Sequence, residues 1–297
     1  MVQSEAPAIG VETILAGLDA LCMEQPELAS AAAYYRLVLP VLKEAQATVP
    51  PFALDETRTA QKIECGEPLF VGEDLPFTSP AISVLFERIC ECMEIAADIT
   101  ADIESAQSPK INHLRRVIAA KESRLLSLIN ASICGDTGYL ERLAKNLGVD
   151  SPLVQVVVQN CLKPYLHVWR EGLAATDIAS WKKGNCPFCG NWPALAELQG
   201  PQRARHLRCG LCGADWAYNR LQCVYCGTTD IKSLGLIQVG EAPVRLSIQT
   251  CDACQGYLKT VVALEAAHPD LLPVEDLAMM SLDLIASQSG YRRLARG

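Results

Sequence analysis

Four Cys-x-x-Cys pairs between residues 186 and 254 constrain this chain more than any other feature of its sequence. The pairs are Cys186-Pro-Phe-Cys189, Cys209-Gly-Leu-Cys212, Cys223-Val-Tyr-Cys226 and Cys251-Asp-Ala-Cys254. Two thiolates three positions apart can bind one metal ion from a single tight turn, and a Gly after the second cysteine permits the positive φ that the turn usually needs. Gly follows three of the pairs, but Gln255 follows the fourth, which leaves room for a different geometry there.

The spacing of the pairs predicts two tetrahedral metal sites with four cysteine ligands each. A single Cys-x-x-Cys could be a redox disulfide motif, but four in succession, with 19 residues between the first two and 24 between the last two, indicate metal binding. The favoured sequential grouping places Cys186, Cys189, Cys209 and Cys212 in one site and Cys223, Cys226, Cys251 and Cys254 in the other. A crossed grouping of first pair with third and second with fourth stays open.

Four thiolates complete the ligand shell of each metal ion, which leaves no position for hydrolytic chemistry. His206 precedes Cys209 by three residues, and we interpret it as a surface or supporting residue rather than a ligand. The sequence contains no Walker loop, no dinucleotide-binding fingerprint and no Gly-x-Ser-x-Gly elbow. We therefore predict that the chain is not an enzyme, and we assign no catalytic or organic-cofactor residues.

The composition favours a helical cytoplasmic protein. Half of the 297 residues are hydrophobic and 6% are aromatic, and an excess of Ala and Leu favours helix over sheet. No apolar run reaches the roughly 18 residues needed to span a bilayer, and the first residues lack the basic and apolar regions of a secretory signal. In a reducing cytoplasm, paired cysteines indicate metal binding before disulfides.

The formal net charge of −8 argues against a nucleic-acid partner. Residues 1–180 contain 24 acidic and 14 basic side chains, whereas residues 181–260 contain 5 and 9. That basic excess disappears once eight thiolates and two divalent ions are counted with it. A nucleic-acid-binding protein usually carries a clear positive surplus, which this chain lacks.

Residues 1–181 are predicted to form an all-α domain. Helices are expected over 10–24 and 28–48, with a kink or break at Pro40, and the proline-rich stretch 50–80 is expected to be a loop with at most one short helix. A helix starting at Ser79 would bury one apolar face. That face consists of Leu85, Ile89, Cys92, Ala96, Ile99 and Ile103.

Three more helices complete this predicted domain. One spans residues 109–134, one runs from a cap at Asp136 to a stop at Gly148, and one runs from Leu153 to about Ser180 with a bend at Pro164. The six cysteines outside the pairs are interpreted as core residues. They are Cys22, Cys65, Cys90, Cys92, Cys134 and Cys161.

The sequence pattern changes after Lys182, where short stretches of alternating apolar and polar residues, turns and cysteine pairs replace the helical periodicity. The segment 240–243 is expected to turn a hairpin that joins Leu234 and Leu236 to the alternation at residues 244–248. A closing helix is expected from Val274 to Leu294. The predicted organisation is a mainly α N-terminal domain (1–181), two small β-rich metal-binding modules of rubredoxin-like or zinc-ribbon-like type with four cysteine ligands each (182–220 and 221–260), and a C-terminal helical segment (261–297).

The cysteine-rich segment resembles a known protein family. The segments that carry the resemblance are Gly184-Asn-Cys186-Pro-Phe-Cys189-Gly-Asn-Trp-Pro193, Arg205-His-Leu-Arg-Cys209-Gly-Leu-Cys212-Gly-Ala-Asp-Trp216, Arg220-Leu-Gln-Cys223-Val-Tyr-Cys226-Gly, Thr250-Cys251-Asp-Ala-Cys254-Gln-Gly-Tyr257-Leu-Lys259, and the tail from Glu275-Asp276 to Gly290-Tyr291-Arg292. Together they are similar to the formate dehydrogenase accessory protein family (FdhE type). The resemblance covers the whole chain in length and layout and is specific from about residue 181 to 293.

The resemblance implies a function that spacing alone does not show. Members of this family are soluble cytoplasmic proteins needed for active respiratory formate dehydrogenase, and they are thought to bind its catalytic subunit before export by the twin-arginine route. Their cysteine modules are regarded as rubredoxin-like and iron-binding, and the eight paired cysteines fall on the family's cysteine positions. Glu275 stands where a second Asp is expected, and Asp276 and Tyr291 receive no role.

Two other functions stay open at this point. Sulfur-ligated iron can change its oxidation state without changing its ligands, so the chain could carry electrons or sense redox state. Alternatively, the modules could be zinc ribbons that bind another protein or nucleic acid, or metals that only stabilise a small domain. Tetrahedral thiolates accept both iron and zinc, so the residues do not decide the metal. They also leave the oligomeric state open, including a homo-oligomer.

Overall fold

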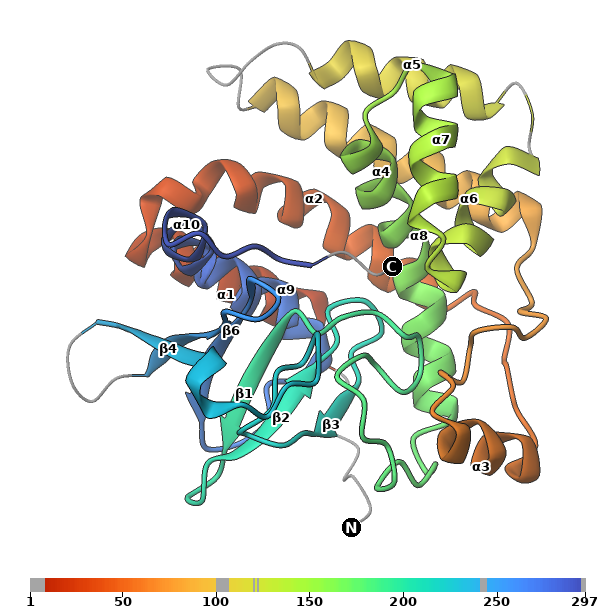
Figure 1. The fold of residues 1–297 in the computed structure, drawn as a ribbon. Coiled ribbons are helices and arrows are strands. Elements are labelled where there is room, and N and C mark those ends of the chain that lie inside the picture. The colour runs from red at the N-terminus through yellow and green to blue at the C-terminus, as the bar shows by residue number, and fades with distance from the viewer. Residues whose placement is uncertain (1–8, 100–106, 120, 122, 241–244, 295–297) are drawn as a thin grey trace. The chain divides into compact units, whose positions relative to one another are not determined.

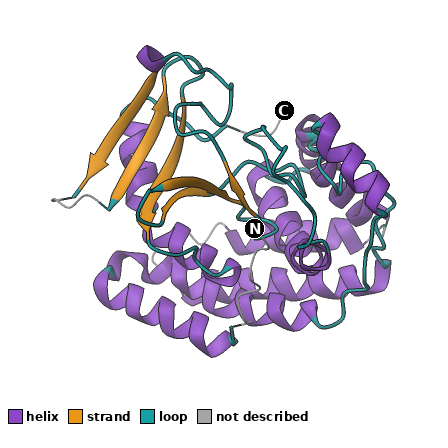
Figure 2. Ribbon diagram, turned by 90° about the horizontal axis from the view of Figure 1, so that it is seen from below, coloured by secondary structure: helices purple, strands orange, loops and turns teal. Residues whose placement is uncertain are grey.

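The computed structural model describes residues 9–99, 107–119, 121, 123–240 and 245–294, and these form two compact units. The helical unit comprises Gly10–Ala53 and Phe70–Leu173. The sheet unit comprises Leu54–Leu69 and the chain from Ala174 onward. A mainly α part is thus combined with a β-rich part that carries the cysteine pairs and ends in helices, as the sequence predicts (Figures 1 and 2).

The helical unit is built from helices that pack around α8. Its elements are α1 (Val11–Glu24), η1 (Pro26–Leu28), α2 (Ala29–Gln46), α4 (Ser79–Ile99), α5 (Gln107–Ala119), α6 (Ser123–Cys134), α7 (Thr137–Leu147) and α8 (Ser151–Gly172). The predicted cap and stop of α7 are confirmed, because Asp136 accepts the N–H of Tyr139 and Gly148 adopts the left-handed conformation. No helix in the described parts of the chain is both long enough and apolar enough to cross a bilayer.

An aromatic cluster forms much of the core beside α8. Trp169 is fully buried, and its ring centroid lies 5.0 Å from Phe77, 5.5 Å from Phe52 and 5.6 Å from Tyr165. Its indole N–H donates to the carbonyl oxygen of Pro50 at 2.8 Å, so burial leaves that donor satisfied. The two segments without regular structure that contain Phe52 and Phe77, before and after α3 (Glu56–Cys65), therefore both pack on Trp169.

Several predicted helix boundaries are wrong. Residues 109–134 form α5 and α6 instead of one helix, because the N–H of Lys121 bonds back three residues to Ile118 and interrupts the α-helical pattern. Helix α8 ends at Gly172 rather than near Ser180, at a residue whose backbone freedom disfavours a helix interior. On α4, Ile99 is 64% exposed instead of buried. Ile103 lies outside the described residues.

The unpaired cysteines divide into buried and accessible groups. Cys90, Cys92 and Cys161 are core residues as predicted, and burial raises the pKa of Cys90 to about 12. In contrast, Cys65 and Cys134 are exposed and Cys22 is half-buried, so the core interpretation is wrong for these three. They lie where their helices face solvent, which cysteine spacing alone does not reveal.

The sheet unit contains one six-stranded mixed sheet with the order β3-β2-β1-β6-β5-β4. Its elements are α3 (Glu56–Cys65), β1 (Leu195–Gln199), β2 (Ala204–Arg208), β3 (Asp215–Ala217), η2 (Ile231–Ser233), β4 (Leu234–Val239), β5 (Leu246–Cys251), β6 (Gly256–Ala263), η3 (Pro269–Leu271), α9 (Leu272–Ala278) and α10 (Met280–Gln288). The predicted hairpin is confirmed by the antiparallel pairing of β4 with β5. Its turn, 241–244, lies outside the described residues.

The sheet consists of two halves with the same order of elements. In each half a cysteine pair precedes a hairpin, a second pair follows it, and a third strand then pairs with the hairpin's second strand. The halves are β1-β2-β3 and β4-β5-β6. The parallel pairing of β1 with β6, which sets Leu195 opposite Lys259, joins them into one sheet.

One face of this sheet packs against the C-terminal helices. Leu195, Ile248 and Val261 on the strands contact Leu272 and Leu282 on α9 and α10 in one buried cluster. The expected closing helix is in fact two helices, because Met279 leaves the helical conformation between them (φ −101°, ψ 20°), and α10 ends at Gln288.

Buried charges cross the first half of the sheet in a connected network. Arg208 is fully buried, and its guanidinium donates to Glu197 at 2.6 Å and lies 3.8 Å from Asp215. Asp215 also bonds to the ring of His206 on β2. Burial by itself raises the pKa of Asp215, but the bond with His206 and the charge of Arg208 outweigh it and hold this pKa below its usual value. The bond with Asp215 raises the pKa of His206.

The segment before the first cysteine pair lies directly against the third pair. At Gly184, a Cβ atom would overlap the backbone carbonyl of Val224, which sits between Cys223 and Cys226. Because backbone atoms hold this position, they cannot yield as a flexible side chain would. Gly184 is therefore the residue that permits the close approach.

We predict that Gly184→Ala destabilises the sheet unit. Introducing a methyl group into occupied space costs about 1–3 kcal/mol, so the urea midpoint followed by circular dichroism should fall. Gly10→Ala is the matched control, since a Cβ there meets open space. Equal midpoints for the two variants would contradict the predicted overlap.

We also predict a pH-dependent role for His206. Because its pKa is raised in the folded chain, its contribution is fully present below the unfolded pKa of about 6.5 and is lost as pH rises through the folded pKa. His206→Gln should lower the free energy of unfolding by about 1 kcal/mol near pH 6 and by less near pH 8.5. Urea unfolding at both values measures this, and a pH-independent difference would refute it.

Candidate metal centres

Site one gathers the four cysteines of the first two pairs. The Sγ atoms of Cys186 and Cys212 are 3.4 Å apart, and those of Cys189 and Cys209 are 3.5 Å apart. All four sulfurs lie within 4.8 Å of one another. The loop before β1 supplies one pair and the loop between β2 and β3 supplies the other, so the site lies at the open end of the β1-β2 hairpin, where Leu195 pairs with Arg208.

Site two repeats this arrangement in the second half of the sheet. Cys223 and Cys254 have sulfurs 3.7 Å apart, as do Cys226 and Cys251, and the four lie within 4.8 Å of one another. The loop before β4 supplies one pair and the turn between β5 and β6 supplies the other. The structure therefore brings the cysteines together in the sequential grouping, not the crossed one.

The sulfur positions fit a tetrahedral ion. With metal–sulfur bonds of about 2.3 Å, the edges of a sulfur tetrahedron measure about 3.8 Å, close to the 3.4–3.7 Å separations. These separations are far longer than the roughly 2.05 Å of a disulfide bond. Eight soft thiol ligands in two sets of four are the donor set that zinc and iron both accept.

The local turns explain why the sulfurs converge. Gly190, Gly213 and Gly227 have φ of 72–75° and donate their N–H groups to the carbonyl of the first cysteine of each pair, at 2.9–3.1 Å. Such a turn points the following N–H groups at the first sulfur. The N–H of Cys212, for example, lies 3.5 Å from the sulfur of Cys209. The glycine requirement predicted from the sequence is thus met at three pairs.

The fourth pair reaches the same backbone conformation without glycine. Gln255 has a φ of 56°, and its side chain donates to the carbonyl of Asp252 at 2.8 Å. Gly256 then starts β6, and a Cβ there would lie 2.7 Å from the ring of Tyr225. The glycine of this turn is therefore displaced by one residue, to the place where another side chain approaches the backbone.

The two sites differ in exposure. The cysteines of site one are all buried, whereas in site two Cys226 is exposed and Cys254 is half-buried. Burial raises the pKa of Cys186 and Cys212 well above the ordinary value, so a nearby cation is needed to keep these thiols ionised at neutral pH. Partial burial acts in the same direction at Cys226, but hydrogen bonds from Thr228 and Cys223 lower its pKa overall.

His206 is not part of either sulfur cluster. Its ring bonds to Asp215, and the groups that could hold an ion among the described residues contain cysteines alone. The interpretation of His206 as a supporting residue fits this geometry. His113 bonds to the carbonyl of Leu147 in the helical unit, and His268 caps the turn at Asp270.

Direct contacts connect the two sites. The ring of Trp192, just after the first pair, packs edge-on against Tyr225 within the third pair at 5.1 Å between centroids. The Tyr225 hydroxyl donates to the carbonyl of Tyr257 on β6 at 2.9 Å. A change at one site therefore has a short packed route to the other.

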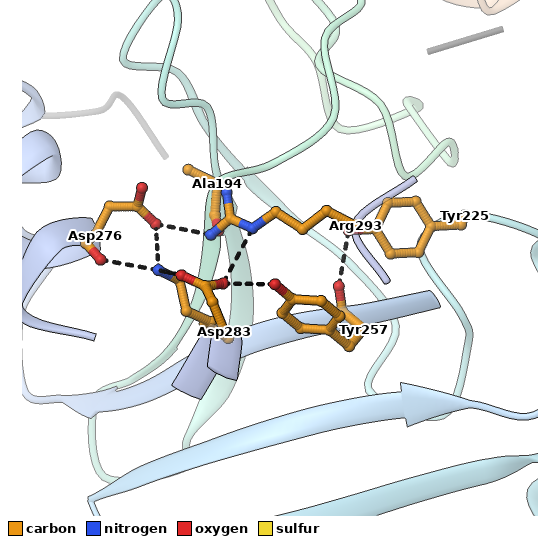
Figure 3. Close-up of polar contacts among 7 residues, drawn as sticks. Ala194, Tyr225, Tyr257, Asp276, Asp283 and Arg293 are labelled. Atoms are coloured by element: carbon orange, nitrogen blue, oxygen red, sulfur yellow. Dashed lines mark hydrogen bonds and ion pairs between the residues drawn. The ribbon is translucent and has the colours of Figure 1, made fainter. Parts of the chain in front are cut away.

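A polar network continues from Tyr257 to the C-terminal residues, as Figure 3 shows. The hydroxyl of Tyr257 donates to Asp283 on α10 at 2.7 Å, and the fully buried Lys259 ammonium contacts both Asp283 and Asp276. Arg293 reaches Asp276 at 2.9 Å and Asp283 at 3.3 Å. Two cations and two anions thus hold α9, α10 and the C-terminal tail on β6.

This network is what the sequence analysis missed. Asp276 received no role, and Asp283 and Lys259 were not considered. A partial signal was present, because the acidic residues Asp276 and Asp283 are followed by the basic tail residues Arg292 and Arg293; the two aspartates lie on different helices, α9 and α10. The pairing of Lys259 with them could not be read in advance because it depends on which face of β6 the helices cover.

The chain matches two domain models of one protein family. Residues 185–220 match the central domain of FdhE and residues 221–296 match its C-terminal domain. A protein FdhE homolog of Aquifex aeolicus is 30% identical over 192 residues, or 63% of this chain and 61% of that protein. One of Rhizobium meliloti is 24% identical over 209 residues, or 68% and 64%. These matches span less than two thirds of the length of either relative.

The fold has a solved counterpart. The crystal structure of the FdhE protein from Pseudomonas aeruginosa superimposes with a TM-score of 0.58 at 22% identity, covering 96% of this chain and 93% of that one. The range of the central domain contains β1-β2-β3 with the cysteines of site one, and the range of the C-terminal domain contains β4-β5-β6 with the cysteines of site two. From these findings, residues 185–296 correspond to the central and C-terminal domains of FdhE, and the chain is similar to FdhE proteins in sequence and fold.

Proposed function

We propose that this chain is a cytoplasmic accessory protein for the assembly of active respiratory formate dehydrogenase, and that it binds the catalytic subunit before export. The match of residues 185–296 to the two FdhE domain models, together with the similarity to FdhE homologs, is the observation that carries the proposal. The sulfur clusters support a role without catalysis by the chain itself, because four ligands fill a tetrahedral shell and leave no position for substrate.

The eight paired cysteines are proposed to bind two metal ions, one in each site. Cys186, Cys189, Cys209 and Cys212 would hold the first, and Cys223, Cys226, Cys251 and Cys254 the second. The resemblance favours iron in rubredoxin-like sites, with zinc as the alternative. Either ion would supply the positive charge that buried thiolates need and would cross-link two loops of each half.

A redox function is the second candidate, and the exposure of site two is the observation that favours it. Electron transfer needs close approach to the metal, and Cys226 provides a solvent-facing ligand. Iron bound by four thiolates would supply reversible one-electron chemistry.

A zinc-ribbon module for protein or nucleic-acid contact is the third candidate. The acidic net charge of −8 disfavours its nucleic-acid version.

Metal content and the visible spectrum separate these candidates. We expect protein purified without oxygen to contain about two metal ions per chain, one for each set of four ligands. Iron with a thiolate charge-transfer band that bleaches reversibly with dithionite would support a redox function. Colourless protein with zinc would remove that candidate and leave client binding. Less than one ion per chain would contradict both proposed sites.

We predict that the two ions leave at different rates. A thiol-binding mercurial or a chelator should remove the ion of site two first, because Cys226 is exposed and the ligands of site one are buried. Release followed with a metallochromic dye should therefore have two phases.

Single-cysteine variants assign these phases. Cys226→Ser should abolish the fast phase and Cys189→Ser the slow one, while Cys134→Ser, an exposed cysteine outside both sites, should keep both phases. A single phase in the unaltered chain, or a fast phase that persists in Cys226→Ser, would show that exposure does not control release.

Client binding is tested by co-purification. We expect the tagged chain to retain the catalytic subunit of formate dehydrogenase, and Cys226→Ser to weaken retention at least about tenfold, a difference of about 1.4 kcal/mol, if site two shapes the contact surface. Cys134→Ser is the control. No retention by the unaltered chain would overturn the proposed function, whereas full retention by a variant lacking the second ion would exclude only site two from the contact.

A further inference from the structure

The face of the sheet opposite α9 and α10 carries a groove of about 270 Å³. Side chains alternate along β5, so Ile248 packs toward the helices while Ser247 and Gln249 line the groove. The groove crosses the strands from Arg205 on β2 to Leu236 on β4, beneath the loop that carries the third cysteine pair.

A buried arginine lines one end of this groove. Arg205 is only 4% exposed, and its Nη1 donates to the carbonyls of Asn219 and Gln222 at 3.0 and 2.9 Å. Its guanidinium also lies over the ring of Tyr218. In contrast, its buried Nε has no hydrogen-bond partner, and Nη2 makes none with the residues that the structure describes. Buried donors are normally paired, so the unpaired Nε–H of Arg205 requires an explanation.

The charge around Arg205 is not balanced by a carboxylate in the groove. Arg220 adds a second guanidinium, and the described lining contains neither Asp nor Glu. Once ionised by a bound metal, the Cys223 sulfur would attract the positive charge of Arg205, but it forms no hydrogen bond to it. A metal-bound thiolate cluster can balance part of the charge, but it leaves the two donors without an acceptor.

The other end of the groove is apolar and open. Ile231, just before β4, and Leu236, on β4, line it and are 68% and 57% exposed. β2 and β4 are separated by four strand spacings of about 4.8 Å, so the groove spans at most about 19 Å. This is longer than one amino acid and matches five or six extended residues at about 3.3 Å each.

We propose that this groove binds an extended peptide that places a carboxylate on the free donors of Arg205 and an apolar side chain between Ile231 and Leu236. A carboxylate can accept from two guanidinium nitrogens at once, which supplies the missing acceptors. The proposal does not depend on the proposed function, and its test needs no formate dehydrogenase subunit.

The probe is the peptide acetyl-Leu-Ala-Val-Ala-Asp-amide, titrated into the full-length protein as purified and followed by calorimetry. Its neutral counterpart has Asn in place of Asp and is otherwise identical. We expect the Asp peptide to bind roughly 10- to 100-fold more tightly, since a charged hydrogen-bond partner is lost in the Asn peptide. Acetyl-aspartate amide should bind more weakly than the peptide, because it lacks the part that reaches the apolar end.

Two variants place the binding in the groove. Leu236→Glu sets a negative charge at an exposed position of the lining and should weaken the Asp peptide at least about tenfold. Leu264→Glu is the matched control, because Leu264 is 83% exposed and lies outside the lining. Arg205→Lys should remove the preference for Asp over Asn, and circular dichroism verifies that each variant is folded.

The following outcomes overturn the proposal. Equal affinities for the Asp and Asn peptides would show that Arg205 does not receive the carboxylate. Equal affinities for the peptide and acetyl-aspartate amide would identify a small-acid site instead of a peptide groove. Unchanged binding in folded Leu236→Glu would place the peptide elsewhere on the protein.

Discussion

The ionisation of buried thiols is the constraint on which the sheet unit depends. Site one places four cysteine sulfurs in an environment where burial raises the pKa of Cys186 and Cys212, and site two repeats the arrangement at a more exposed position. Thiols packed this closely are stable as ligands only when a cation compensates their charge. The hairpins themselves are short, with strands of five or six residues, so a metal ion that cross-links their loops would compensate for a small core.

The joining of the two halves gives the sheet unit two different faces. Each half alone would be a three-stranded ribbon, but the parallel pairing of β1 with β6 creates one sheet with two different faces. One face receives α9 and α10, held by Lys259, Asp276, Asp283 and Arg293, and the other carries the groove with Arg205. The contact of Trp192 with Tyr225 also brings the cysteine sites into one packed arrangement. The family's solved structure shares this fold.

The sequence predicts correctly those features that depend on backbone conformation within a few residues. They are the cap at Asp136, the stop at Gly148 and the glycines after three cysteine pairs. The predictions are wrong where the exposure of a side chain depends on packing against distant parts of the chain. Ile99 fits the apolar period of α4 yet is exposed, and Cys65 and Cys134 are exposed although cysteine is usually buried. Periodicity identifies a face but not whether another element covers it.

The sequence by itself determined the ligand chemistry. Spacing of two residues within each cysteine pair and a following glycine specify a tight turn, and this turn forms from short-range hydrogen bonds alone. Only the tertiary structure decided that the pairs group sequentially, that site two is exposed and site one is buried, and that Arg205 lies without a carboxylate partner at the end of a groove. The reason is that these properties depend on strand pairings between residues as far apart as Leu195 and Lys259, and no local pattern encodes which strands become neighbours.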